Sequence, residues 1–312
     1  MPAAAERMEI VRFQNQGLEL SGMLYKPDGP GPFPAVLYNH GSAPGTLNDQ
    51  AFQRLGPLFA ERGWVFFAPY RRGQGLSSLA GPFIGDEISA ARTRRILLGL
   101  LIGAPSVVLL YLLIARKRQR ALRVAWGMTL ALFAVFAIHF SATRAAAGTM
   151  VRLLETDHLG DQVAAFQWLE KQSIVDRMRI ATAGNSFGGV EALLGAERID
   201  YCAAIDASGG AESWASAPQL RALMARAARN SKAPTFFFQA ENDYDLTPSR
   251  TLSAEMKNAG KISELKIYPA FGKSPSDGHR FAWAGSDVWA ADVFRFLETH
   301  CLNQRRTTPA HR

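Results

Sequence analysis

Cysteine is scarce in this sequence, which has two cysteines in 312 residues. Cys202 falls in an apolar run, 201–205, that predicts a strand, and Cys301 lies near the end of the last predicted helix. Cysteines placed in this way predict reduced thiols and argue against a disulfide framework. The six histidines are scattered and, although His300 precedes Cys301, they form no cluster with metal-ligand spacing, so the sequence predicts no metal site. We expect no cofactor.

The sequence also lacks the features of several other protein classes. Residues 1–12 contain two acidic residues and no apolar core of seven or more, so they do not resemble a secretory signal. There is no internal repeat and no low-complexity tract. With 48% hydrophobic residues, the chain is long enough to bury the core of one large domain. We expect a cytoplasmic catalytic domain.

The net charge of +8 is unevenly distributed. Much of the positive excess flanks or bridges two apolar stretches, and more lies in the C-terminal tail. These cations are Arg92, Arg94, Arg95, Arg116, Lys117, Arg118, Arg120, Arg123, Arg144, Arg305, Arg306 and Arg312. No basic stripe is interleaved with aromatic residues and no nucleic-acid motif is present. This placement favours a membrane surface over nucleic acid as a partner.

The most informative motif is G-x-S-x-G at residues 184–188. It follows a predicted strand, 178–183, and precedes a helix predicted to begin at Phe187. In a sharp turn from strand to helix, the glycines provide room and backbone freedom, and the serine hydroxyl projects above the edge of the sheet. Ser186 is therefore the candidate nucleophile.

A serine nucleophile needs a histidine base and an acid that orients the histidine. Asp243 follows a predicted buried strand, 235–239, and Asp245 is a rival for the same role. A later strand, 264–268, leads into a glycine-rich loop that carries His279, the candidate base. The order serine, aspartate, histidine is typical of one of the known serine hydrolase arrangements.

The fourth part of such a site is an oxyanion hole. A predicted strand, 35–38, ends at Asn39-His40-Gly41-Ser42, where a glycine lets backbone N–H groups turn toward a developing negative charge. The predicted donors are the N–H of Phe187 and that of Gly41 or Ser42.

Three further residues are candidates for the substrate pocket. For His40 we favour a structural role over proton transfer, because His279 is better placed for that step. Glu212 and Trp214 follow a predicted strand, 203–207, and are candidates for lining the acyl or alcohol pocket. Simple packing is an equally good interpretation of Trp214.

Five short segments carry a resemblance to a known superfamily. They are His40-Gly41, Arg72-Gly73-Gln74-Gly75, residues 184–189, Ala240-Glu241-Asn242-Asp243 and Gly278-His279-Arg280-Phe281. The chain resembles serine hydrolases of the α/β-hydrolase superfamily, in the branch of dienelactone-hydrolase-like and prolyl-oligopeptidase-like esterases. The resemblance covers about residues 8–90 and 145–301 and implies an α/β fold, with a mostly parallel sheet flanked by helices. Ser186 stands where true dienelactone hydrolases carry cysteine, and the family's aspartate before the Arg-Gly turn is absent.

Two apolar stretches interrupt this pattern. Residues 96–114 carry no charge and, as a helix, would span about 28 Å, close to the roughly 30 Å of a bilayer's hydrocarbon core. Residues 124–140 form a weaker second stretch. Small residues, Gly99 with Gly103 and Gly127 with Ala131, would let the two helices approach closely.

The sequence therefore predicts an apolar helical hairpin, 91–144, inserted into a hydrolase domain formed by 1–90 and 145–312. A hairpin in the lipid bilayer is favoured over a cap above the acyl pocket, because residues 96–114 have no polar face. Its topology stays open, and so does a third arrangement in which the cationic tip lies among lipid headgroups. The oligomeric state is not predicted.

These features together predict a membrane-associated serine esterase that works by acyl transfer. A peptidase is less favoured, since the chain lacks the propeller domain of the oligopeptidase relatives. Thioester cleavage is also compatible with these residues. So is a membrane-tethered, non-catalytic binding or scaffold protein, because a fold does not fix a function.

Overall fold

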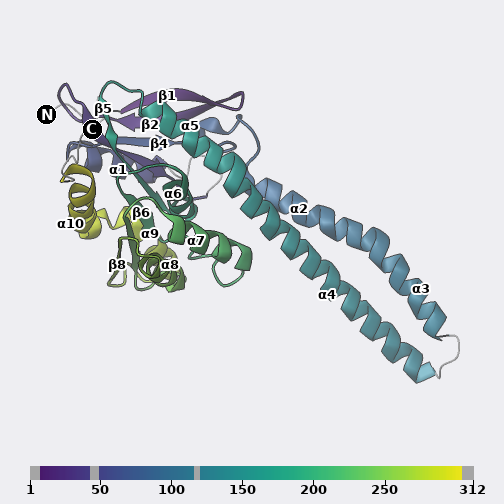
Figure 1. Cartoon of the computed structure of the whole chain (residues 1–312). Coiled ribbons are helices and arrows are strands. Elements are labelled where there is room, and N and C mark those ends of the chain that lie inside the picture. Colours follow the sequence, from purple (N-terminus) through teal and green to yellow (C-terminus); the bar gives the residue numbers. More distant parts are fainter. Residues whose placement is uncertain (1–7, 43–48, 116–119, 304–312) are drawn as a thin grey trace, which may run out of the picture. The chain divides into compact units, whose positions relative to one another are not determined.

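The computed structural model describes residues 8–42, 49–115 and 120–303. Within it the chain forms two compact units (Figure 1). The first contains Met1–Pro82 and Leu154–Arg312, and the second is Phe83–Leu153. The segment predicted as an insertion, 91–144, lies inside the second unit.

The first unit is built on one eight-stranded sheet with the order β1-β2-β4-β3-β5-β6-β7-β8. Only β2 runs antiparallel to its neighbours, and every other pair in the sheet is parallel. The predicted mostly parallel sheet is therefore confirmed. The strands are β1 Met8–Asn15, β2 Leu18–Tyr25, β3 Phe33–Asn39, β4 Val65–Pro69, β5 Val175–Asn185, β6 Ala204–Ala207, β7 Thr235–Ala240 and β8 Ser263–Tyr268.

Helices cover both faces of this sheet (Figure 1). Adjacent strand residues point to opposite faces, so Phe66 belongs to one buried cluster and Phe67 to the other. This is why the central strands read as unbroken apolar runs. The longer helices of the first unit are α1 Asp49–Ala60, α5 Leu159–Leu169, α6 Phe187–Arg198, α7 Pro218–Asn230, α8 Thr247–Asn258, α9 Pro275–Ala284 and α10 Ser286–Leu297. Shorter helical segments are η2 Gly75–Ser77, η4 Leu154–His158 and η5 Glu298–Leu302.

His279 lies in a helix, so its predicted loop setting is wrong. Helix α9 begins with a capping box, in which the Ser274 hydroxyl accepts from the Asp277 N–H and the Asp277 carboxylate accepts from the Ser274 N–H. Pro275 occupies the first turn, where its missing N–H costs nothing. These signals favour a helix more strongly than Gly278 disfavours one, so the helix begins four residues before His279.

Cys202 and Cys301 form a disulfide across a sequence separation of 99 residues, so the prediction of reduced thiols is wrong. Cys202 lies in the bend before β6, because the strand begins later than expected, and Cys301 lies in η5. The sequence around each cysteine carries no information about a pairing that the tertiary fold makes.

The second unit is a pair of long helical arms. One arm is α2 Ile84–Leu98, η3 Gly99–Gly103 and α3 Ala104–Ala115, and the other is α4 Arg120–Leu153. The arms pack closely where glycines lie between them, since a Cβ on Gly99 would stand 2.7 Å from Ile138 and one on Gly127 would stand 3.2 Å from Tyr111. Two helical stretches, Ile84–Leu113 and Val124–Leu169, are long and apolar enough to cross a membrane, and their most apolar windows have no buried residues.

Candidate active site

The nucleophile candidate Ser186 sits between the end of β5 and the start of α6, with φ 56° and ψ −120°. A positive φ is uncommon for a residue with a side chain and is found where the surrounding fold holds a strained turn. A side chain on Gly184 would collide with the Gly188 carbonyl, and one on Gly188 would collide with the Asn39 carbonyl. Both outer glycines of the motif are therefore required by packing.

Sheet order brings the candidate residues to one edge of the sheet. Ser186, Asp243 and His279 follow β5, β7 and β8, whose carboxyl ends lie at one edge of the sheet. His279 Nδ1 lies 2.8 Å from Asp243 Oδ1. A carboxylate only accepts hydrogen bonds, so Nδ1 carries a proton, and in the neutral ring Nε2 is the nitrogen with the lone pair. Nε2 is buried and has no hydrogen-bond partner among the described residues.

Asp243 is held as a carboxylate. Burial opposes its ionisation, but hydrogen bonds from His279, Ser208 and Gln239 outweigh burial and lower the pKa of the Asp243 carboxyl. Gln239 Nε2 donates to Oδ2 at 2.8 Å, and the N–H of Tyr244 donates to Oδ1 at 2.7 Å. An ionised acid fixes the tautomer of the histidine and stabilises its protonated form.

The rival carboxylate, Asp245, has a different partner. Its Oδ1 accepts from the Thr247 N–H at 2.8 Å, at the start of α8. A carboxylate at a helix N-terminus is a common stabilising contact. The structure thus brings His279 to Asp243 and leaves Asp245 with the helix.

The predicted oxyanion donors come from two neighbouring strands. Asn39 at the end of β3 pairs with Gly184 of β5, so the loop at Gly41 and Ser42 begins beside the turn at Ser186. Phe187 is the first residue of α6, and its N–H makes no backbone hydrogen bond within the described residues. Gly41 is buried and Ser42 is exposed. Free N–H groups on both sides of the serine are what a developing oxyanion requires.

The three pocket candidates lie in different environments. His40 is fully buried and its ring contacts the guanidinium of Arg71, so it does not face the solvent. Trp214 is also buried and packs on Gly210, whereas Glu212 is exposed. None of the three shares a hydrogen bond with Ser186 or His279 in the described part of the chain.

Sequence reasoning missed the residues that support the acid. Gln239 lies inside the apolar strand β7 and is fully buried, which is costly for an amide unless it is hydrogen-bonded. A polar residue inside a predicted buried strand was the available signal. The Tyr244 and His279 rings meet edge to face with their centroids 5.2 Å apart, a contact that the sequence does not show.

The described residues contain no group of three or more histidine, cysteine, aspartate or glutamate side chains that could hold a metal ion. The candidate site thus combines a serine in a strained turn, a histidine whose Nε2 has no hydrogen-bond partner among the described residues, an aspartate with a lowered pKa and candidate backbone donors. Together with the eight-stranded sheet, it defines an α/β hydrolase.

Residues 20–301 match the family model described as the dienelactone hydrolase family. The chain belongs to this family and is a hydrolase. No curated protein matches it significantly.

Solved structures agree on the fold. A putative dienelactone hydrolase from Klebsiella pneumoniae is 13% identical, with a TM-score of 0.56, and the match covers 95% of this chain and 99% of that one. The Pyrococcus furiosus esterase is also 13% identical, with a TM-score of 0.55 and coverage of 94% and 90%. The Pyrococcus horikoshii acylaminoacyl peptidase is 16% identical with a TM-score of 0.58, and the match covers 96% of this chain but 42% of the peptidase.

Proposed function

We propose that the protein is a serine hydrolase that cleaves carboxylic esters. The observation that carries this proposal is the 2.8 Å contact between Asp243 and His279, which leaves His279 Nε2 free at the sheet edge where Ser186 holds its strained turn. Because the acid is ionised and the base keeps its lone pair, the histidine can take the serine proton.

The reaction follows from these roles. Ser186 Oγ attacks the ester carbonyl carbon while its proton passes to His279, and the former carbonyl oxygen becomes an oxyanion held by the N–H of Phe187 and of Gly41 or Ser42. Collapse of this intermediate breaks the bond to the alcohol, which leaves with the proton of His279. Water then attacks the acyl-enzyme with His279 as base, and the acid is released.

Esters are proposed over peptides because of the extent of the matches. This chain spans 99% of the Klebsiella dienelactone hydrolase and 90% of the Pyrococcus furiosus esterase, but 42% of the acylaminoacyl peptidase. The activity test below distinguishes ester cleavage from thioester and peptide cleavage.

We further propose that residues 96–140 lie in a lipid bilayer. Large apolar side chains on both arms of the hairpin are exposed, among them Leu101 at 73% and Phe133 at 67%. A surface of this size and polarity is rare on a protein that meets only water. A bilayer with a hydrocarbon core of about 30 Å would surround the apolar side chains of both arms with lipid, whereas in a cap one apolar face would be exposed to water.

The disulfide bears on which side of the membrane the first unit lies. The sequence alone favours the cytoplasm, but a bond between Cys202 and Cys301 is typical of an oxidising compartment. We propose that the first unit faces such a compartment and that the hairpin tip lies on the cytoplasmic side. The tip carries five cations and the flanks carry four, so the positive-inside count adds little and this orientation rests on the disulfide.

Two experiments test these proposals. Detergent-solubilised enzyme should hydrolyse p-nitrophenyl esters, with Ser186→Ala as the inactive control, and should cleave peptide p-nitroanilides and thioesters more slowly. Faster peptide cleavage would make it a peptidase. For location, cells quenched in acid and treated with a mass-tagged maleimide should yield untagged protein, whereas two tags per chain would place the cysteines in a reducing compartment.

A further inference from the structure

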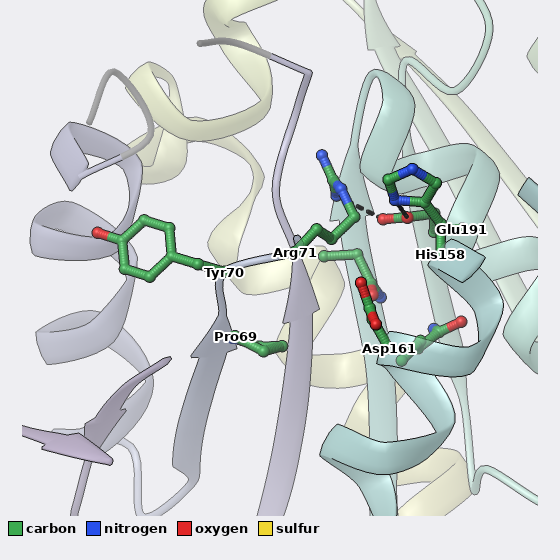
Figure 2. A pocket seen from close by; sticks show the side chains of 8 residues that line it. Pro69, Tyr70, Arg71, His158, Asp161 and Glu191 are labelled. Atoms are coloured by element: carbon green, nitrogen blue, oxygen red, sulfur yellow. Dashed lines mark hydrogen bonds and ion pairs between the residues drawn. The ribbon is translucent and has the colours of Figure 1, made fainter. Parts of the chain in front are cut away.

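A cluster of buried charged and polar side chains lines a small pocket at the end of β4 (Figure 2). Arg71 follows β4, Glu191 lies on α6 and His158 ends η4, and all three are almost completely buried. The proposed reaction uses none of them. Buried charges are costly, so such a cluster needs a physical explanation.

Arg71 fixes one side of the oxyanion hole. Its guanidinium donates from Nη1 to the His40 carbonyl at 2.7 Å and from Nη2 to the Gly41 carbonyl at 2.9 Å. Each carbonyl shares a planar trans peptide with the next N–H, which points the opposite way. By holding these two carbonyls, Arg71 sets the directions of the Gly41 and Ser42 N–H groups, whichever of them serves as the donor.

Arg71 also contacts Phe187, whose N–H is the predicted donor on the other side of the oxyanion hole. Its guanidinium carbon lies 4.8 Å from the centroid of the Phe187 ring, and His158 meets the same ring edge-on at 5.8 Å. The Phe187 side chain is therefore held between a cation and an imidazole. One side chain, Arg71, thus contacts both segments that carry the predicted donors.

Glu191 supplies the counter-charge. Its Oε2 lies 2.5 Å from Arg71 Nη1, and Gln74 Oε1 accepts from Arg71 Nε at 3.2 Å. Burial lowers the pKa of His158 to about 3, with Arg71 and Arg72 adding to the effect, so its imidazole is neutral. Asp161 is already committed to Arg72, with contacts of 2.7 and 3.0 Å. Burial raises the pKa of the Glu191 carboxyl to about 7, and the ion pair and hydrogen bond with Arg71 oppose this effect. Glu191 is therefore the carboxylate that pairs with Arg71.

We propose that Arg71, neutralised by Glu191, is a positioning residue that orients the oxyanion donors on both sides of Ser186. This inference rests on the proposed serine mechanism. Lysine cannot replace Arg71, because a point charge does not bridge two carbonyls and stack on a ring at the same time. Loss of the alignment should weaken the interaction with the oxyanion and leave ground-state binding in place.

The test compares two ligands of nearly equal size that differ in their ability to form an oxyanion. In an alkyl trifluoromethyl ketone, Ser186 Oγ adds to the carbonyl carbon, its proton passes to His279 and the carbonyl oxygen becomes an oxyanion. The matching trifluoromethyl carbinol cannot react in this way. For Arg71→Lys we expect about a 10- to 100-fold loss in kcat on p-nitrophenyl butyrate and a similar rise in Ki for the ketone. These effects are smaller than the roughly 100- to 1,000-fold loss that follows removal of an oxyanion donor, because the donors are misaligned and not removed. KM and the Ki of the carbinol should stay within about twofold.

Arg72→Lys is the matched control, because Arg72 is equally buried but binds Asp161. All rates are expressed per active site, counted by end-point labelling with a fluorophosphonate. Glu191→Gln, which keeps the shape of Glu191, provides a second variant. It should change kcat and the ketone Ki in the same direction but by less, with KM and the carbinol Ki nearly constant. The test therefore remains possible if Arg71→Lys folds poorly.

Three results overturn the inference: an unchanged ketone Ki, equal losses of ketone and carbinol binding, or the same loss in Arg72→Lys. A wild-type enzyme that neither hydrolyses the ester nor reacts with the fluorophosphonate would contradict the proposed function itself. These two failures are therefore distinguishable.

Discussion

The two units of this chain use the same apolar residues in opposite ways. Phe236 in β7 of the first unit is 1% exposed, whereas Phe133 in α4 of the second is 67% exposed. In the first unit, apolar residues of neighbouring strands and helices bury one another. In the second, large apolar side chains on both arms are exposed, among them Leu101 and Phe133. Apolar content alone therefore does not identify a core; the solvent-facing side of each element has to be considered as well.

The division extends to chemistry. Every candidate for nucleophile, base, acid and oxyanion donor belongs to the first unit, and none lies within Phe83–Leu153. If the comparison holds, changes in the first unit abolish turnover without affecting membrane attachment, and removal of the second has the converse effect.

The largest expected effect is on the nucleophile. Ser186→Ala should reduce ester hydrolysis by about a million-fold, as in other serine triads, because the remaining groups cannot form an acyl-enzyme. The measurement is kcat on p-nitrophenyl butyrate, with circular dichroism as the folding control. Retention of more than a few per cent of the activity by purified enzyme would break the assignment of chemistry to this serine.

The acid comes next. Asp243→Asn should lower kcat by roughly ten-thousand-fold, because an amide next to His279 Nδ1 favours the wrong tautomer. Asp245→Asn is the matched control two residues away and should change kcat little, since the Asp245 carboxylate accepts from the Thr247 N–H and not from His279. If the control proves the more damaging change, the acid has been misassigned.

The third prediction concerns the hairpin and its proposed role in membrane attachment. Full-length protein should sediment with membranes and resist alkaline carbonate, because its apolar arms have no other partner. Replacement of residues 95–143 by a Gly/Ser linker should move the protein to the supernatant and leave kcat on p-nitrophenyl acetate unchanged. A freely soluble full-length chain, together with an inactive excised variant, would show that the hairpin is a pocket-forming cap.

The smallest expected effect concerns the disulfide. Cys202→Ser should lower the free energy of unfolding of the excised variant by about 2–5 kcal/mol, because it releases a closed loop of nearly one hundred residues. Denaturant titration with and without reducing agent measures this change. An unfolding midpoint that is insensitive to both the mutation and the reducing agent would mean that the disulfide does not form.

The sequence predicts the parts of this molecule that depend on local patterns. Apolar runs indicate the strands, the glycines around Ser186 indicate the turn, and the uncharged stretch from residue 96 to 114 indicates the first arm of the hairpin. The order of Ser186, Asp243 and His279 shows which groups the sheet would bring together.

Contacts between distant segments could not be predicted in the same way. The pairing of Cys202 with Cys301 and the pairing of Arg71 with Glu191 join residues 99 and 120 positions apart. No local pattern encodes either pair. The loop predicted around His279 is wrong for a different reason: Gly278 suggests a loop, while the capping box that begins at Ser274 favours a helix more strongly.

The central claim is that Ser186 is an activated nucleophile in a unit that works independently of the hairpin. The most direct measurement is fluorophosphonate labelling of full-length protein in its membranes and of the excised variant, followed by mass spectrometry of the peptide that carries the adduct. We predict one adduct per chain, on Ser186, in both proteins. A chain that remains unlabelled, or an adduct on another residue, would contradict the account.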